Sequence, residues 1–268
     1  MSKTIWVNTL IQNEDKFIWF AIMSVIDYVD KILIFDTGST DKTVAIIKEI
    51  QTNFKDKVIF KEWGQAEGKM LTDLRHKQFE QSKCDFVLVL DGDEIWPESS
   101  IKKAVERINH GGDNIDGIVV PFYNLMGDIY HYQDDTAGRY NLLGRKGNLT
   151  IRFANRRVPE MQVKNKYPDE GFFIGDMALQ DSKKLVFLDA PYLHATHLVR
   201  SSVGRQDKRY KIKFEVGHAF PKNFDYPKAF YSEFPKNVGS PLRQRSMSYT
   251  LFALLQYPLR FILRRLRK

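Results

Sequence analysis

Short runs of hydrophobic residues alternate, along the first half of the chain, with longer segments in which hydrophobic residues recur every three or four positions. The short runs are rich in Val, Ile and Phe and predict buried strands, whereas the longer segments predict helices packed on one face. The predicted strands are residues 4–11, 31–35, 58–60, 86–90 and 118–122. The predicted helices are residues 17–28, a segment through 44–50 capped by Ser39 or Thr40, residues 69–82 and a segment through 101–108.

The alternation of strands and helices, with short connections, predicts βαβ units and an α/β fold with a mostly parallel sheet. In such sheets ligands bind outside the carboxyl ends of the strands. After about residue 124 the pattern changes. Residues 124–148 are polar and rich in Gly, Tyr and Asp, which predicts a long functional loop, and residues 149–154 and 184–189 again have the pattern of strands.

The ends of the strands carry acidic residues where ligands are expected. The predicted strand 86–90 is followed by Asp91, Gly92, Asp93 and Glu94. In an extended chain residues i and i+2 point to one side, so Asp91 and Asp93 can converge on one cation, and Gly92 permits close approach of a ligand. Oxygen ligands of this kind suit Mg²⁺ or Mn²⁺ shared with substrate phosphates. The alternative is a solvated loop, because Asp-x-Asp is a common pattern.

A second acidic residue, Asp36, closes the predicted strand 31–35 within the sequence FDTGSTDKT, residues 35–43. It could contact a ribose or a base at the same edge of the sheet, or it could simply belong to a capped strand–turn–helix connection. The segment GQAEGKM, residues 64–70, is one residue too short for a P-loop and has Met70 where Ser or Thr is needed.

Three segments together resemble the family 2 glycosyltransferases, which have the GT-A fold. They are IQNEDKFI (11–18), KILIFDTGSTDKT (31–43) and DLRHKQFEQSKCDFVLVLDGDEIWP (73–97). The resemblance covers roughly residues 4–124 in order. It implies a Rossmann-like, mostly parallel sheet with helices on both faces, followed here by a C-terminal helical extension.

The resemblance also implies roles for individual residues. In that family the first strand end and the acid of the second strand bind the nucleotide base, usually uracil. The residues at the matching positions are Ile11, Gln12 and Asn13, which would line the base pocket, Asp36 on the base, Arg75 near the nucleotide or its diphosphate, and Asp91 and Asp93 as the pair that holds a divalent metal, Mn²⁺ or Mg²⁺, on the diphosphate.

Later segments faintly resemble a bacterial subgroup of the same family. These segments are IRFANRR (151–157), YPDEGF (167–172) and LHATHLVRS (193–201). By this resemblance Glu170 occupies the position of the subgroup's acid and is the first choice for catalytic base. Asp169 and then Asp176 are the alternatives. His197 is expected as a further metal ligand, with His194 as the alternative, and either could equally be a structural histidine.

Charge and cysteine content narrow the partners and the compartment. The net charge of +8 lies entirely in residues 236–268, where eight basic residues occur without an acid. A basic groove for nucleic acid is therefore not expected. The single cysteine, Cys84, cannot build a disulfide framework and is expected to pack rather than react, which suits a reducing cytosol. No segment has the ~18 apolar residues of a spanning helix, and the N-terminus lacks a secretory signal pattern.

The end of the chain, SMSYTLFALLQYPLRFILRRLRK (246–268), is apolar and then basic. This pattern predicts an interfacial helix that contacts an anionic membrane surface through residues 244–268, or else a helix packed on the domain. We expect a cytoplasmic protein, peripheral on the membrane face. The expected domains are a GT-A domain, 1–235, with a nucleotide-binding half, 1–124, and an acceptor-side half, 125–235, before a basic amphipathic tail, 236–268.

Together these features predict an inverting, metal-assisted glycosyltransferase. It would move a sugar from a nucleotide diphosphate sugar, with UDP expected, to a hydroxyl of a glycan or lipid-linked acceptor in cell-surface polysaccharide synthesis. A non-catalytic nucleotide-sugar-binding or nucleic-acid-binding protein with a GT-A-like domain is the alternative.

Overall fold

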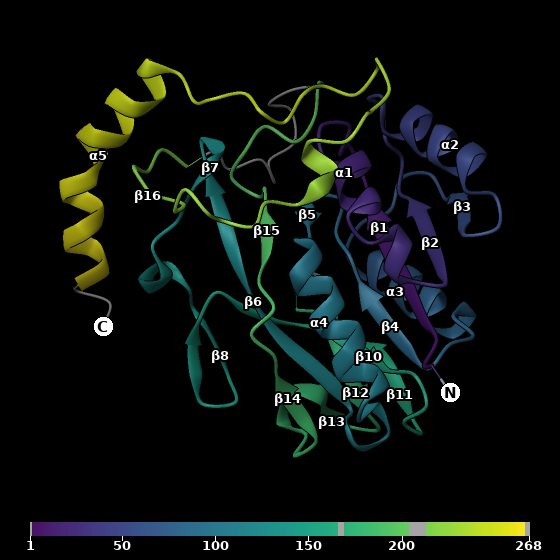
Figure 1. Cartoon of the computed structure of the whole chain (residues 1–268). Coiled ribbons are helices and arrows are strands. Elements are labelled where there is room, and N and C mark those ends of the chain that lie inside the picture. The colour runs from purple at the N-terminus through teal and green to yellow at the C-terminus, as the bar shows by residue number, and fades with distance from the viewer. Residues whose placement is uncertain (1, 166–168, 204–212, 266–268) are drawn as a thin grey trace.

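The computed structural model describes residues 2–165, 169–203 and 213–265, and it places a central sheet between helices (Figure 1). The helices are α1 (Ile18–Met23), α2 (Thr43–Asn53), α3 (Lys69–Gln81), α4 (Glu98–Asn109) and α5 (Met247–Arg265). The strands are β1 (Ile5–Ile11), β2 (Lys31–Asp36), β3 (Val58–Glu62), β4 (Phe86–Val89), β5 (Glu94–Ile95), β6 (Gly117–Met126), β7 (Asp128–Tyr132), β8 (Tyr140–Leu142), β9 (Arg145–Gly147), β10 (Leu149–Asn155), β11 (Met161–Lys164), β12 (Gly171–Ile174), β13 (Met177–Ala178), β14 (Leu185–Phe187), β15 (Tyr192–His194) and β16 (His218–Ala219).

The strand order explains why functional residues gather at one edge. The order runs β3-β2-β1-β4-β10-β6-β7-β16, with β1 parallel to both β2 and β4. Strand β10 is antiparallel to its neighbours β4 and β6. The carboxyl ends of β1, β2 and β4 therefore lie along one edge, with Ile11 directly opposite Asp36. This is the mostly parallel α/β sheet, flanked by helices and followed by a C-terminal helix, that the sequence predicts.

An aromatic stack in the core fixes the segments that follow β4. Trp96 stacks on Tyr192 with ring centroids 5.2 Å apart, and Tyr192 stacks on Phe122 at 5.5 Å. Trp96 and Tyr192 are almost completely buried. The stack holds β5 against β15, where His194 pairs with Glu94 in register. The buried rings thus bring a late histidine beside the acids that follow β4.

Three local predictions were wrong. The expected helix 17–28 is broken into α1 and a short 3-10 turn, Ile26–Tyr28. Neither Ser39 nor Thr40 caps α2, because that helix begins at Thr43, whose backbone N–H donates to Asp41 Oδ1 at 2.9 Å. The Ser39 hydroxyl instead accepts a hydrogen bond from the backbone of Asn13 at 2.8 Å.

The expected loop 124–148 is the third error, because much of it is β structure. It holds the end of β6, strand β7 and the β8–β9 hairpin. Polar and glycine-rich composition misled here, since edge strands and hairpins tolerate both. The remaining predicted strands and helices are confirmed to within a few residues, and α4 starts directly after Pro97.

Helix α5 stands at the edge of the molecule (Figure 1), and its described side chains, residues 247–257, pack through one side of the helix. Tyr249 and Ala253 are buried, and the Tyr249 hydroxyl donates to the Lys213 carbonyl at 2.7 Å. Across the described residues, none of the helices has the length and apolar character needed to cross a bilayer. Cys84 packs against a buried hydrophobic cluster that contains Phe79 and Val87. Burial raises the pKa of its thiol to about 12, so it is no nucleophile at neutral pH.

Candidate active site

The carboxylate of Asp91 lies just beyond β4 and is held between two arginines. Arg75 of α3 approaches Oδ1 at 2.9 Å, and Arg152 of β10 approaches Oδ2 at 3.3 Å. Burial alone would raise the pKa of Asp91, but the two guanidinium groups outweigh it and hold that pKa below its ordinary value. Asp91 is therefore a fixed anion at the edge of the sheet.

Asp93 is a second fixed anion, with a side chain only 1% exposed. Its Oδ2 is 3.0 Å from Arg200 Nη1 and 3.5 Å from His194 Nε2. Burial opposes ionisation, but Arg200 and then His194 lower the pKa of Asp93 well below its usual range. Burial likewise lowers the pKa of His194, yet the neighbouring Asp93 more than offsets this and the net shift is upward.

Two further glutamates lie beside Asp91 and Asp93, and both are buried. Glu94 is fully buried against Arg152, and burial raises its pKa to about 7 although the arginine opposes the shift. Glu14 accepts from Arg200 Nη1 at 2.9 Å, and burial raises its pKa well above the ordinary value. The Oε2 atom of Glu14 is buried without a hydrogen-bond partner. Both glutamates therefore hold a proton to higher pH than an exposed glutamate.

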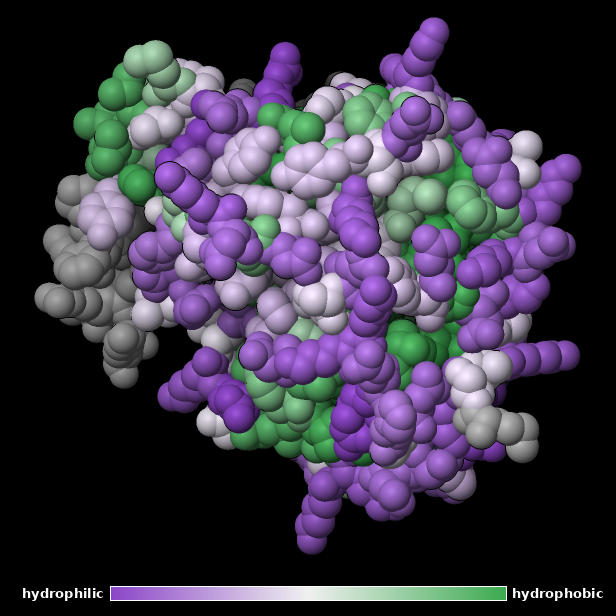
Figure 2. Space-filling view, in the orientation of Figure 1, coloured by the Kyte–Doolittle hydropathy of each residue, from purple (hydrophilic) through white to green (hydrophobic). Residues whose placement is uncertain are grey.

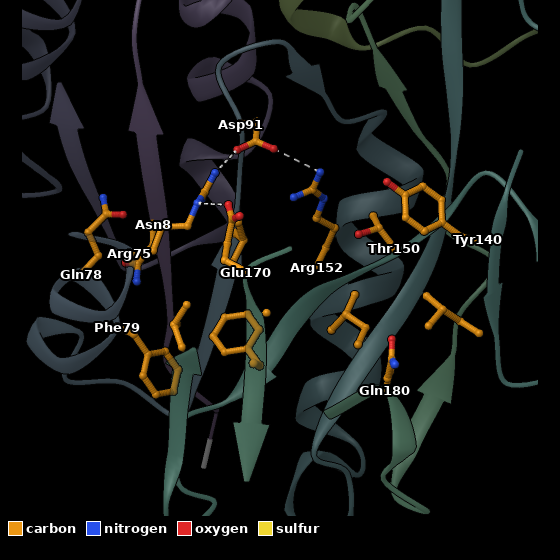
Figure 3. Close-up of a pocket in the computed structure, with 16 residues that line it drawn as sticks. Asn8, Arg75, Gln78, Phe79, Asp91, Tyr140, Thr150, Arg152, Glu170 and Gln180 are labelled. Carbon is orange, nitrogen blue, oxygen red and sulfur yellow. Dashed lines mark hydrogen bonds and ion pairs between the residues drawn. The ribbon is translucent and has the colours of Figure 1, made fainter. Parts of the chain in front are cut away.

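Two cavities meet at Asp91 and Arg75, which line both. After the roles that we propose for them, the cavity of about 280 Å³ is named the donor cleft and the cavity of about 300 Å³ is named the acceptor cavity. The donor cleft is lined by Leu10, Ile11, Gln12, Glu14, Thr37, Leu71, Arg75, Asp91, Gly92, Asp93, His194, Thr196 and Arg200. Figure 3 shows the acceptor cavity, with Asp91 between Arg75 and Arg152 at one end.

The predicted base-pocket residues are divided between the donor cleft and the loops beneath it. Ile11 and Gln12 line the cleft. Asn13 does not line it; its side-chain oxygen accepts from the backbone of Thr40 at 2.8 Å, and its φ of 57° is left-handed, which asparagine tolerates. Asp36 accepts from the backbone of Gly38 at 3.0 Å, whereas its Oδ1 is buried without a partner. Asp36 therefore caps a turn and keeps one oxygen unsatisfied.

One of the three predicted catalytic acids lies in the cavity on the side of Asp91 away from the donor cleft. Glu170 lines the acceptor cavity, where its Oε1 is 3.4 Å from Arg75 Nε and its Oε2 is buried without a hydrogen-bond partner. Asp169 is exposed. Asp176 is fully exposed and pairs with Lys164 at 3.0 Å. Only Glu170 of these acids reaches the site.

The histidine expected as a metal ligand, His197, is buried but does not line the donor cleft, whereas His194 lines it beside Asp93. The chemistry of Asp91, Asp93 and His194, two carboxylates and an imidazole nitrogen, fits a divalent metal. Among the residues that the structure describes, no group of three or more His, Cys, Asp and Glu side chains is arranged so that it could hold a metal ion, and Asp91, Asp93 and His194 are instead engaged in ion pairs. A metal here would need further ligands from its substrate, as Mg²⁺ does with phosphates.

A match to a family model identifies the family of this chain. The family model described as glycosyl transferase family 2 matches residues 9–187. This chain belongs to glycosyl transferase family 2. Membership makes it a glycosyltransferase by family and confirms the resemblance drawn from its motifs. No match was found among curated proteins.

Several solved structures of glycosyltransferases are similar to this family 2 chain. S. aureus TarS 1-349 has a TM-score of 0.47 and 14% identity, over 72% of this chain and 60% of that one. A longer TarS structure has a TM-score of 0.48 and 15% identity, over 72% of this chain and 37% of that one. Glucosyl-3-phosphoglycerate synthase from Mycobacterium tuberculosis, crystallised with Mn²⁺ and UDP-glucose, has a TM-score of 0.43 and 15% identity, over 72% and 71%. This chain therefore spans less than two thirds of either TarS chain, and these likenesses identify neither its donor nor its acceptor.

Sequence reasoning missed four charged residues of the site of this family 2 protein: Glu14, Glu94, Arg152 and Arg200. Glu14 and Glu94 stand inside quoted motifs, and the density of acids there could have signalled that arginines must approach from elsewhere. Arg152 and Arg200 lie in segments quoted for other residues, and only the antiparallel insertion of β10 and the path after β15 bring them to the site.

Replacing Arg152 with Met is expected to destabilise the fold strongly. Glu94 and Asp91 would lose a buried cation, and breaking such a pair costs about 3–5 kcal/mol. The matched control is Arg157→Met, whose side chain is 58% exposed and pairs with Asp85 at the surface, for a cost of at most ~1 kcal/mol. Urea unfolding of the three proteins measures both, and equal losses would contradict the role of Arg152.

The ion pair of Asp93 and His194 predicts a titration. In metal-free protein kept in EDTA, the pKa of His194 is expected to lie above its ordinary value of 6.5, and to fall in Asp93→Asn, because burial and Arg152 then lower it against Glu94 alone. A raised histidine pKa stabilises the fold below the unfolded value, and this contribution disappears as pH rises through the folded pKa. NMR titration of the imidazole measures the shift. An unchanged His194 pKa in Asp93→Asn would show that the pair is not formed.

Proposed function

We propose that this chain transfers a sugar from a UDP-sugar to an acceptor hydroxyl with inversion at the sugar carbon. The observation that carries the proposal is the meeting of two cavities at Asp91 and Arg75. One cavity offers cations and fixed anions for a diphosphate and its metal, and the other offers Glu170 beside the boundary. The sugar to be transferred would lie at that boundary.

The donor cleft has both apolar and charged walls. Leu10, Ile11 and Leu71 provide an apolar side for a base, and Arg75 and Arg200 provide guanidinium groups for a diphosphate. The backbone at Gly92 lies close to Glu14, because a Cβ atom at position 92 would be 2.9 Å from Glu14 Cγ. Asp36 is only 2% exposed and does not line the cleft, so its contact with base or ribose would have to be made through the unpartnered Oδ1, and Asn13 would act by holding the loop.

A divalent metal, Mn²⁺ or Mg²⁺, would be held by Asp91 and Asp93, with His194 better placed than the expected His197. When bound, it would stabilise the negative charge that develops on the leaving diphosphate. The residues of this chain contribute independently. Arg200, now 3.0 Å from Asp93, can also turn N–H donors toward the phosphate oxygens, and Arg75 holds Asp91 in place.

Glu170 is the base in this proposal. Its buried Oε2 would accept the proton of the acceptor hydroxyl while the oxygen forms a bond to the sugar carbon and the diphosphate leaves. Arg75 orients the carboxylate through Oε1. Asp169, which is exposed, would act only if its loop moved toward the cavity. Both halves of the expected domain 1–235 would take part on each side, because Arg200 of 125–235 lines the donor cleft and Arg75 of 1–124 lines the acceptor cavity; the tail 236–268 follows.

Nucleotide binding tests the donor cleft. UDP with Mn²⁺ is expected to stabilise the protein, by roughly 2.7 kcal/mol at about 100 times its dissociation constant, whereas GDP, CDP and dTDP should do less. The double variant Asp91→Asn/Asp93→Asn should lose the stabilisation, because the metal loses both anions. Thermal unfolding measures it. Asp113→Asn, an acid with a side chain 66% exposed, is the control and should behave as wild type. Stabilisation that survives in the double variant would exclude the metal role.

We further propose that α5 docks on an anionic membrane surface and places the enzyme at the cytoplasmic face, near glycan or lipid-linked acceptors. Its outward side carries Leu251, Leu254 and Leu255, exposed by 60%, 52% and 78%. Spacings of three and four residues put them on one face, opposite Tyr249 and Ala253, and Figure 2 shows the apolar patch that results. The tail contains no acid to repel anionic lipid. The side chains of its basic end, 258–268, lie outside the described residues.

Replacing Leu251 and Leu255 with Glu is expected to release the protein from vesicles of phosphatidylcholine and phosphatidylglycerol. Each leucine is worth ~1.5 kcal/mol or more when buried, so binding should fall at least about tenfold. Sedimentation with vesicles measures the bound fraction. Tyr231→Glu, at a position 59% exposed outside α5, should bind as wild type. Equal binding of the double variant would mean that the helix serves another contact.

A further inference from the structure

The acceptor cavity has two chemically different ends. Its polar end, shared with the donor cleft, carries Asp91, Arg75, Arg152 and Glu170 (Figure 3). Its other end, which we call the apolar pocket, is formed by Phe79, Val89, Leu142, Ile151, Val163 and Phe172, which belong to one hydrophobic cluster, while the polar side chains of Asn8, Gln78, Tyr140, Thr150 and Gln180 also line the cavity. A ligand that fills the cavity must therefore be polar at one end and apolar at the other.

The apolar pocket is built by elements that hold each other in place. Phe79 of α3 and Phe172 of β12 lie with ring centroids 5.3 Å apart. Val163 of β11 pairs in register with Phe172, so both side chains leave the same face of the β11–β12 pair. Leu142, from the β8–β9 hairpin, adds a nearly buried side chain. Three separate parts of the fold thus converge on one apolar surface.

Such a surface favours an apolar group over a sugar hydroxyl. Water in contact with these side chains is released when an apolar group replaces it, and this release is favourable. A hydroxyl placed against the six apolar side chains would lose its water partners to a surface that offers no hydrogen-bonding groups of its own. The volume of about 300 Å³ stands at the low end for ligand cavities, so the group must be small.

We propose that the acceptor cavity selects a hydroxyl acceptor carrying an apolar substituent of about the size of a phenyl ring. The substituent fills the apolar pocket, and the acceptor hydroxyl then lies at the polar end, beside the unpartnered Oε2 of Glu170. The inference rests on the proposed function, since it takes Glu170 as the base. It adds the class of acceptor that the site prefers.

Paired acceptor probes test this preference. Phenyl and methyl β-glycosides of glucose, galactose and N-acetylglucosamine are titrated into the full chain by calorimetry, with and without UDP and Mn²⁺. At least one phenyl glycoside is expected to bind about tenfold to hundredfold more tightly than its methyl partner, as burial of an aromatic group predicts. The absence of a phenyl preference in every pair overturns the inference.

Matched variants locate the preference. Val163→Phe fills the pocket and should abolish the phenyl preference, and Thr150→Phe, which fills the cavity from β10, guards against a folding defect in the first variant. The control is Gln162→Phe, on the same strand but the opposite face, where the preference should persist. A preference that survives both filling variants overturns the inference.

The titrations with UDP distinguish a failure of this inference from a failure of the proposed function. UDP binding that persists without a phenyl preference sinks only the inference. A phenyl preference without any nucleotide binding keeps the apolar pocket but removes its role in sugar transfer.

Discussion

The placing of Asp91 between Arg75 and Arg152 is the interaction on which the rest of the site depends. Three acids follow β4 within a short stretch, and burying them together costs energy unless cations are close. The fold provides these cations from α3, from β10 and from the segment after β15. Each arginine connects the acids to a different part of the chain. The same contacts that make burial tolerable therefore build both cavities and the boundary between them.

The first half of the fold could be predicted from sequence because its signals are local. The runs before Asp36 and Asp91 are short, apolar and fully buried, and parallel strands covered by helices leave little alternative. Asp91 and Asp93 followed from the same reasoning, since strand ends meet at one edge, whereas Glu14 and Glu94 did not. The prediction failed where it was based on amino-acid composition and not on the periodicity of hydrophobic residues. The segment 124–148 has polar edge strands, and its residues resemble those of a loop.

The cations and the apolar pocket could not be predicted because they depend on long-range contacts. Arg152 reaches Asp91 only because β10 enters antiparallel to β4, and Arg200 reaches Asp93 across a sequence separation of 107 residues. His194 rather than His197 faces Asp93 because the stack of Trp96 and Tyr192 fixes the register of β15. Contacts between residues so far apart in the sequence cannot be recognised in the hydrophobic pattern of a single chain without homologous sequences.

The antiparallel strand β10 has a consequence for how such proteins can change. It covers the outer edge of β4 and also delivers Arg152, the cation that Glu94 and Asp91 need. If residues 1–124 were separated from the rest of the chain, β4 would have an open edge and the buried charges of Glu94 and Asp91 would lose this cation. Exchange of the later segments between relatives is thus restricted to those that bring an arginine at this position. The β8–β9 hairpin and the β11–β12 pair are free of this requirement, whereas β10 stays constrained.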